Sequence, residues 1–82
     1  LEQAIEAKFV NDQVLQDVKK MMNLLPTTQR EVVYMRFYQQ LSFKEIAETT
    51  NVSINTALGR MRYALINLRK MAQEHDLMLQ LL

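Results

Sequence analysis

The residues of this sequence that could do chemistry are concentrated in one basic segment near its C-terminal end. Residues 53–71 contain four basic side chains and no acidic one, whereas the whole chain of 82 residues has a formal net charge of only +1. On a helix, amide, hydroxyl and guanidinium groups of this segment share the face opposite its apolar stripe. That face consists of Asn55, Thr56, Gly59, Arg62, Tyr63 and Ile66, with Arg60 and Arg69 at its flanks. Such groups suit base edges and phosphates, and the charge asymmetry indicates an anionic partner.

The start and the middle of this segment carry two further signals. Ser53 is placed to cap the helix, where free backbone N–H groups can meet a phosphate. Gly59 is the only glycine of the chain and lies inside the expected helix, at a cost of about 1 kcal/mol relative to Ala. A missing side chain lets a helix backbone approach a groove closely. The alternative is that the glycine is merely tolerated.

The composition excludes several other classes of function. The chain has no cysteine, which rules out a disulfide scaffold, a thiolate zinc site and a cysteine nucleophile. His75 is the only histidine, and its neighbours Glu74 and Asp76 do not face it on a helix. No phosphate-binding loop, nucleophile–base pair or metal-ligand spacing occurs. We therefore expect neither an enzyme nor a cofactor nor a metal, and no segment is apolar enough to insert into a membrane.

The elements that position the basic face are all helices. Helix-forming residues dominate the chain, and no alternating run of β-branched residues competes. We predict an all-α fold, a small helical bundle of four to five helices that contains a helix-turn-helix. The expected helices are residues 1–9, a second from Asn11 or Asp12 to Pro26 unless the two are continuous, residues 28–39, 43–49, and Ile54 to at least Met71.

Capping signals set the predicted starts of three of these helices. Thr28 with Glu31, and Ser42 with Glu45, have capping-box spacing, and Ser53 precedes the last helix. Arg36 is placed to pair with Glu45 and so to join two helices by an ion pair.

The short helix, its turn and the long helix form the helix-turn-helix. Ala47 is small where two helices must cross closely, Asn51 tolerates a left-handed backbone at the turn, and Val52 can fill the space beneath it. Beyond the turn, apolar residues recur at intervals of three and four and predict the core-facing stripe of the last helix. They are Ile54, Ala57, Leu58, Met61, Ala64, Leu65, Leu68 and Ala72.

Several motifs in a fixed order make this pattern more specific than a lone helix-turn-helix. They are Leu24-Leu25-Pro26, Arg30-Glu31-Val32-Val33, Arg36-Phe37, Leu41-Ser42-Phe43-Lys44-Glu45-Ile46-Ala47-Glu48, Val52-Ser53-Ile54-Asn55-Thr56-Ala57 and Arg60-Met61. This run resembles region 4 of bacterial RNA polymerase sigma factors of the sigma-70 family, most closely the extracytoplasmic-function group. The likeness spans about residues 22–71 of a single domain 1–82, with residues 1–21 as N-terminal helix or helices and 72–82 as a tail. Because the chain begins at Leu1 rather than Met, we expect it to be part of a longer protein.

The resemblance implies a cytoplasmic domain that reads the minus-35 promoter element in the major groove. It also implies docking on the flap of the RNA polymerase β subunit through an apolar groove around residues 14–37, and an anti-sigma factor is a further partner it suggests. By position, Asn55, Leu58 and Gly59 are base-facing residues. Backbone or adjacent contacts fall to Ser53, Thr56, Arg60 and Arg62, with Tyr63 on the same face. Lys44 either touches a phosphate or is a surface lysine, and Arg69 and Lys70 are expected near phosphates or solvent.

Two positions depart from the family's pattern. Family members often carry Lys or Arg where Leu58 stands, and Ser or Gln where Gly59 stands, so direct hydrogen-bond readout at those two bases is weakened. Leu58 either touches a thymine methyl group or extends the core stripe.

Two rival functions follow from the same residues. A dimeric helix-turn-helix regulator would use the apolar tail, Leu77, Met78, Leu79, Leu81 and Leu82, for self-association. A sigma-like domain used mainly for protein binding would explain the loss of polar groups at Leu58 and Gly59.

Overall fold

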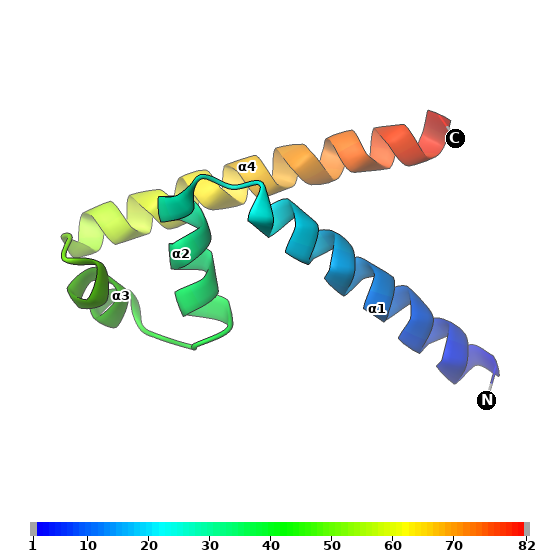
Figure 1. Cartoon of the computed structure of the whole chain (residues 1–82), viewed down its shortest axis with the longest axis horizontal. Helices are drawn as coiled ribbons and strands as arrows, with labels where there is room; N and C mark the ends of the chain where they lie inside the picture. The colour runs from blue at the N-terminus through cyan, green and yellow to red at the C-terminus, as the bar shows by residue number, and fades with distance from the viewer. Residues whose placement is uncertain (1, 82) are drawn as a thin grey trace.

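The computed structural model describes the backbone of residues 2–81 and the side chains of residues 12–76 and 81. This part of the chain folds into four helices, α1 (Glu2–Asn23), α2 (Thr27–Phe37), α3 (Phe43–Thr50) and α4 (Ile54–Leu81), and contains no strand. Figure 1 shows α2 and α3 beside the first half of α4. The predicted all-α fold with a helix-turn-helix is confirmed.

The N-terminal segment forms one continuous helix, which settles the alternative that the sequence left open. Asn11 and Asp12 lie inside α1 rather than at the start of a second helix. Neither residue breaks a helix, because each is disfavoured in a helix interior by only a fraction of a kcal/mol, about 0.7 at most. The helix ends where the N–H groups of Leu24 and Leu25 donate to the carbonyls of Met21 and Met22, each at 3.1 Å. This tighter turn precedes Pro26, which disfavours helical geometry in the residue before it.

The start of α2 differs from the prediction. Helix α2 begins at Thr27 with Pro26 as its N-cap residue, and no side chain caps it, so the predicted Thr28–Glu31 capping box is wrong. Pro26 has φ −53° and ψ 148°, and its carbonyl accepts from the Arg30 N–H at 2.9 Å. Proline fixes its own φ, and with Pro26 as N-cap the helix starts two residues earlier than a cap at Thr28 would place it.

The end of α2 also comes earlier than predicted, at Phe37 rather than Gln39. Gln40 takes a left-handed conformation, with φ 56°. The Leu41 N–H then returns to the Met35 carbonyl at 3.0 Å, which closes the turn that leads into α3.

Helix α3 has the predicted caps at both ends. The Ser42 hydroxyl accepts from the Glu45 N–H at 3.1 Å, and the Glu45 carboxylate accepts from the Ser42 N–H at 3.2 Å. This hydrogen bond from the Ser42 backbone holds the pKa of Glu45 below its ordinary value. Asn51 ends the helix in the left-handed region, with φ 57°. The capping box and the turn of the helix-turn-helix are therefore confirmed.

Arg36 makes contacts other than the predicted ion pair with Glu45. Its Nη1 donates to the Leu41 carbonyl at 3.0 Å, and its Cζ lies 5.1 Å from the centroid of the Phe43 ring. The Glu45 carboxylate is already engaged by the Ser42 N–H. The prediction of an Arg36–Glu45 bridge is wrong, although Arg36 does connect α2 to the start of α3.

The core lies between α2, α3 and the first half of α4. Its buried residues are Met22, Leu25, Val32, Val33, Ile46, Ala47, Ala57, Met61 and Ala64, with Val52 packed against them beneath the turn. The stripe of α4 is narrower than predicted, because Leu58 and Leu65 are 44% and 43% exposed and Ile54 is also exposed. Leu58 lies about 100° around the helix from Ala57, beyond the reach of α2 and α3.

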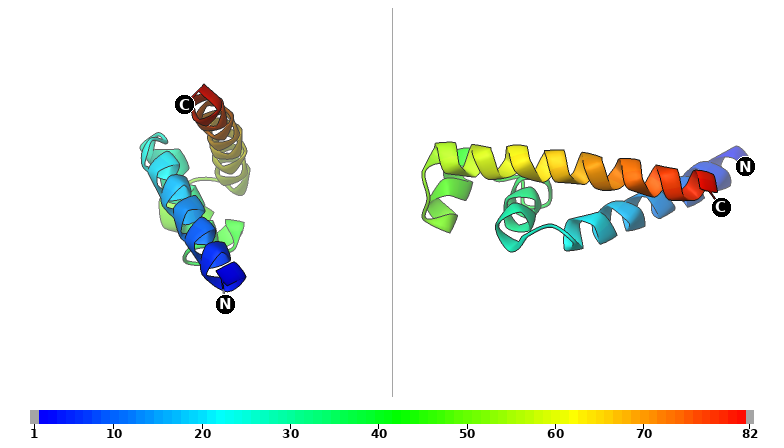
Figure 2. Two further views of the ribbon diagram at one scale, coloured as in Figure 1. Left: turned by 90° about the vertical axis from the view of Figure 1, so that its right-hand side faces the viewer. Right: turned by 90° about the horizontal axis from the view of Figure 1, so that it is seen from above.

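The long α1 and α4 make few contacts with each other. Between them, the His75 Nε2 lies 3.3 Å from the Asp17 Oδ2. The Asn67 amide of α4 donates instead to the Gln29 side chain of α2, at 2.8 Å. Figure 1 shows the two helices running apart towards their termini, whereas their outer parts overlap in the view from above, at the right of Figure 2. The predicted packing or self-association of the tail concerns Leu77, Met78, Leu79 and Leu82, whose side chains lie outside the described residues, whereas Leu81 is 82% exposed. Within residues 2–81, no helix combines the length and apolarity that a membrane span needs.

Candidate nucleic-acid interface

The N-terminal end of α4 is capped as predicted and still offers free donors. The Ser53 hydroxyl accepts from the Thr56 N–H at 3.1 Å and donates to the Thr56 hydroxyl at 2.9 Å. The first N–H groups of any helix lack an acceptor within the helix. Ser53 takes that of Thr56, which leaves the N–H groups of Ile54 and Asn55 for an external acceptor. Together with the positive end of the helix dipole, they form a suitable site for a phosphate.

The residues predicted to face DNA lie on the side of α4 that is turned away from the core. The side chains of Asn55, Thr56, Leu58, Arg62 and Tyr63 are exposed, whereas Gly59 and Arg60 are half-buried. The core uses Ala57, Met61 and Ala64 on the opposite side. We call Asn55, Thr56, Leu58, Gly59, Arg62 and Tyr63 the outer face of α4.

Gly59 is not required by the fold. A Cβ atom built at this position would meet nothing within 4 Å apart from the backbone of its own helix. The backbone there has ordinary helical geometry rather than a positive φ. Packing and conformation therefore give no reason for a glycine in the second turn of α4.

A shallow hollow adjoins the outer face. It has a volume of about 500 Å³ and is lined by Leu58, Met61, Arg62, Leu65, Ile66 and Arg69. Of the two alternatives for Leu58, extension of the core is wrong, because its side chain is 44% exposed and lies outside the buried cluster. Apolar side chains thus form the floor of the hollow, and two guanidinium groups stand beside them.

The remaining predicted basic residues are also at the surface. Lys44 is exposed in the first turn of α3, the other helix of the motif. Arg69 and Lys70 are exposed further along α4. The first acidic residue of α4 is Glu74, so the first five turns of this helix carry positive charge alone.

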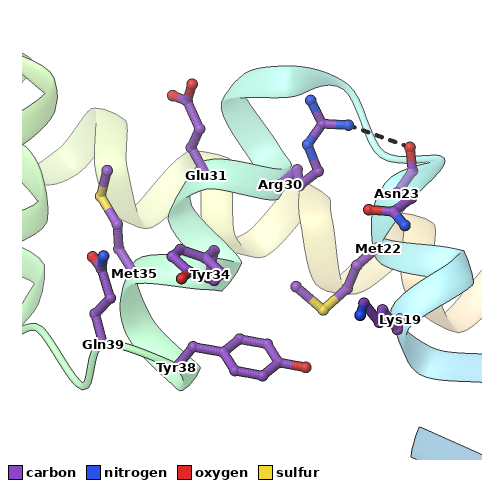
Figure 3. Close-up of a pocket in the computed structure, with 9 residues that line it drawn as sticks. All are labelled: Lys19, Met22, Asn23, Arg30, Glu31, Tyr34, Met35, Tyr38 and Gln39. Atoms are coloured by element: carbon purple, nitrogen blue, oxygen red, sulfur yellow. Dashed lines mark hydrogen bonds between the residues drawn. The ribbon is translucent and has the colours of Figure 1, made fainter. Parts of the chain in front are cut away.

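A second surface lies between α1 and α2. It is a hollow of about 610 Å³ lined by Lys19, Met22, Asn23, Arg30, Glu31, Tyr34, Met35, Tyr38 and Gln39. The rings of Tyr34 and Tyr38 stack with their centroids 5.4 Å apart. Figure 3 shows the Tyr38 side chain directed towards Met22 and Lys19 of α1, and the Arg30 guanidinium donating to the Asn23 carbonyl.

This hollow overlaps the groove expected around residues 14–37 and extends beyond it to Tyr38 and Gln39, and the sequence did not single out its aromatic residues. Tyr34 and Tyr38 are four residues apart and so share one face of α2. The sequence signal that could have revealed this aromatic surface is the pair of tyrosines on the helix face that also carries Glu31. Among the side chains that the structure describes, no three histidine, aspartate or glutamate residues gather as metal ligands would.

The comparison with known families adds one finding to this geometry. The family model described as "Sigma-70, region 4" matches residues 15–65. The match runs from the second half of α1 through α2 and α3 into α4, and it includes the whole outer face. Among curated proteins, none matches this chain.

Proposed function

This chain belongs to the sigma-70 region 4 family, a DNA-binding and non-enzymatic part of sigma factors, and from that premise we propose that it reads the minus-35 promoter element. The reading helix is α4, lying in the major groove. Its family group is the extracytoplasmic-function type, and its setting is the cytoplasm. The observation that carries the proposal is the outer face of α4, which is exposed, begins at a capped helix start and takes no part in the core.

The mechanism is positional. The major groove admits an α-helix, and the N-terminal turns of a recognition helix contact base edges. The N–H groups at the Ser53 end and the guanidinium of Arg60 contact phosphates and fix the register. Asn55 then faces the bases, and Arg62 contacts the DNA backbone or lies adjacent to those bases. Lys44 adds a phosphate contact from α3, as the first helix of such a motif crosses the DNA backbone.

Polymerase docking uses a different surface. The hollow between α1 and α2 presents the exposed rings of Tyr34 and Tyr38 beside the half-buried Met35, and soft methionine and aromatic groups suit an apolar protein segment. We propose that it receives the flap of the β subunit. Because this hollow belongs to α1 and α2 and the DNA face belongs to α4, one domain binds both partners at once. An anti-sigma factor that covers either surface would block initiation.

The test is a selection of binding sites from random duplex DNA at low salt, followed by titrations at several salt concentrations. Each neutralised phosphate contributes about 0.9 to the slope of log K against log salt concentration. The double variant Arg60→Ala/Arg62→Ala is expected to weaken binding to all sequences and to lower this slope by about one to two, because it withdraws up to two guanidinium groups from the DNA. The matched control is Lys19→Ala/Lys20→Ala, which removes the same charge from exposed positions of α1.

The possible results separate the three functions. One short asymmetric motif, with a slope lowered only in the arginine variant, supports the proposal. A palindrome with half-sites about 10 bp apart would favour a dimeric regulator instead. No enriched motif, either alone or with core polymerase, would leave a domain that binds protein only, and equal slopes in both variants would remove α4 from the DNA.

A further inference from the structure

Leu58 is an apolar side chain placed where the fold makes no use of it. It stands on the exposed outer face, with 44% of its surface accessible, and does not belong to the core. A leucine that stays exposed to water adds little to the stability of the fold, because an apolar side chain stabilises a structure by removing its apolar area from solvent. A partner that covers Leu58 would remove this apolar area from water.

The neighbours of Leu58 define what that molecule presents. Asn55 lies one turn before it and Arg62 one turn after it, so the three side chains form one row along α4. Gly59, the next residue, leaves open space where a side chain would stand. The row is thus an amide, an isobutyl group and a guanidinium, beside a stretch of bare helix backbone.

Charge identifies the partner as DNA rather than an apolar protein segment. Arg62 and Arg69 stand beside the apolar floor of the hollow that Leu58 lines, and α4 carries no acid before Glu74. A major groove offers the matching combination, because phosphates flank an edge of bases. On that edge, the C5-methyl group of thymine is the one apolar feature among the four bases.

We propose that Leu58 recognises the methyl group of a thymine in the minus-35 site, and that Gly59 lets the α4 backbone come close enough for this contact. Leu58 is then a specificity-determining residue that reads by apolar contact, where other members of the family use polar groups. This inference rests on the proposed function and deepens it.

The experiment removes the methyl group from the DNA and leaves its hydrogen bonds unchanged. Each thymine of the selected site is replaced singly by deoxyuridine, and the Kd is measured for the unmodified chain, for Leu58→Ala and for Leu65→Ala. At one thymine, deoxyuridine is expected to weaken binding of the unmodified chain about fourfold, the effect of losing one buried methyl-sized group. The same replacement should have no effect on Leu58→Ala.

Leu65→Ala is the matched control, since Leu65 lines the same hollow, is 43% exposed and lies two turns further along α4. This variant should keep the fourfold effect. Circular dichroism checks that both variants remain folded, as their exposure predicts. Deoxyuridine effects that are absent everywhere, or equal in the unmodified chain and Leu58→Ala, overturn the inference and leave the proposed function standing. A selection that enriches no site overturns the proposed function, and the inference with it.

Discussion

Replacing Gly59 with alanine should make the protein more stable and its DNA binding weaker. The added Cβ would meet nothing within 4 Å, so no steric penalty arises. An interior helical glycine is about 1 kcal/mol less favourable than alanine, and 1 kcal/mol corresponds to a rise in Tm of roughly 4–8 °C for a domain of 60–100 residues. In the complex, the same methyl group would separate the helix backbone from the groove. Loss of one good base contact costs about 1–3 kcal/mol, or roughly 5- to 150-fold in Kd.

Thermal unfolding followed by circular dichroism gives the first quantity, and titration of the selected duplex gives the second. Gln73→Gly is the control. Gln73 is exposed on the same helix, about 21 Å further along its axis, so this variant should lose helix stability and keep its DNA affinity. An unchanged Kd in Gly59→Ala would show that the glycine is only tolerated on the outer face. A lowered Tm would contradict the open space around this residue.

Four further predictions concern the helix-turn-helix and its supports. Ser42→Ala should lower the free energy of unfolding by about 1 kcal/mol, as measured in urea, because α3 loses its N-cap. The hydrogen bond from the Ser42 backbone lowers the pKa of Glu45 in the folded state. The stabilisation from the ionised Glu45 is therefore complete above the ordinary glutamate pKa of about 4.3, and it is lost as the pH falls through the lower pKa of the folded state. Glu45→Gln should reduce the loss of stability at acid pH, and a pH profile of stability identical to that of the unmodified chain would contradict this prediction. Ile46 is fully buried, so Ile46→Val should lower the free energy of unfolding by about 0.5–1.5 kcal/mol and Ile46→Ala by about 2–5 kcal/mol. Denaturant titrations measure both losses, and equal losses would show that the core does not pack closely around this side chain. Arg36→Lys should lower the free energy of unfolding by about 1 kcal/mol, because a lysine cannot keep both the planar contact with the Phe43 ring and the hydrogen bond to the Leu41 carbonyl. Scanning calorimetry measures this loss, and an unfolding transition identical to that of the unmodified chain would contradict the prediction.

The sequence predicted best what depends on a few neighbouring residues. The Ser42–Glu45 box, the Ser53 cap and the left-handed Asn51 are local arrangements, and all three are present. Thr28 shows where such signals fail, because Pro26 starts α2 without any side-chain cap. Gln40 was missed because glutamine carries no particular signal for a left-handed backbone.

Interactions between elements were less predictable. The Glu45 carboxylate accepts from the Ser42 N–H in its own cap, whereas the Arg36 guanidinium lies against the Leu41 carbonyl and the Phe43 ring, so the two side chains do not pair. The width of the buried apolar stripe of α4 depends on how much of this helix α2 and α3 cover. Hydrophobic periodicity in the sequence does not reveal that coverage, so two interpretations of Leu58 stayed open. The candidate DNA face could be placed because a helix has only one side opposite its core. The aromatic part of the α1–α2 hollow needed the packing of two helices to become visible.

The division of α4 into two sides also bears on how such a protein diverges. Ala57, Met61 and Ala64 hold the inner side together with the partly buried Leu68 and Met71, whereas Asn55, Leu58 and Gly59 on the outer side lie outside the buried cluster. Surface substitutions away from special features usually change stability by no more than about 0.5 kcal/mol. A duplicated gene could therefore exchange these outer residues one at a time and, under the proposed function, acquire a new promoter set while the fold stays intact. The hydrophobic scaffold is inherited, and the sequence preference is free to change.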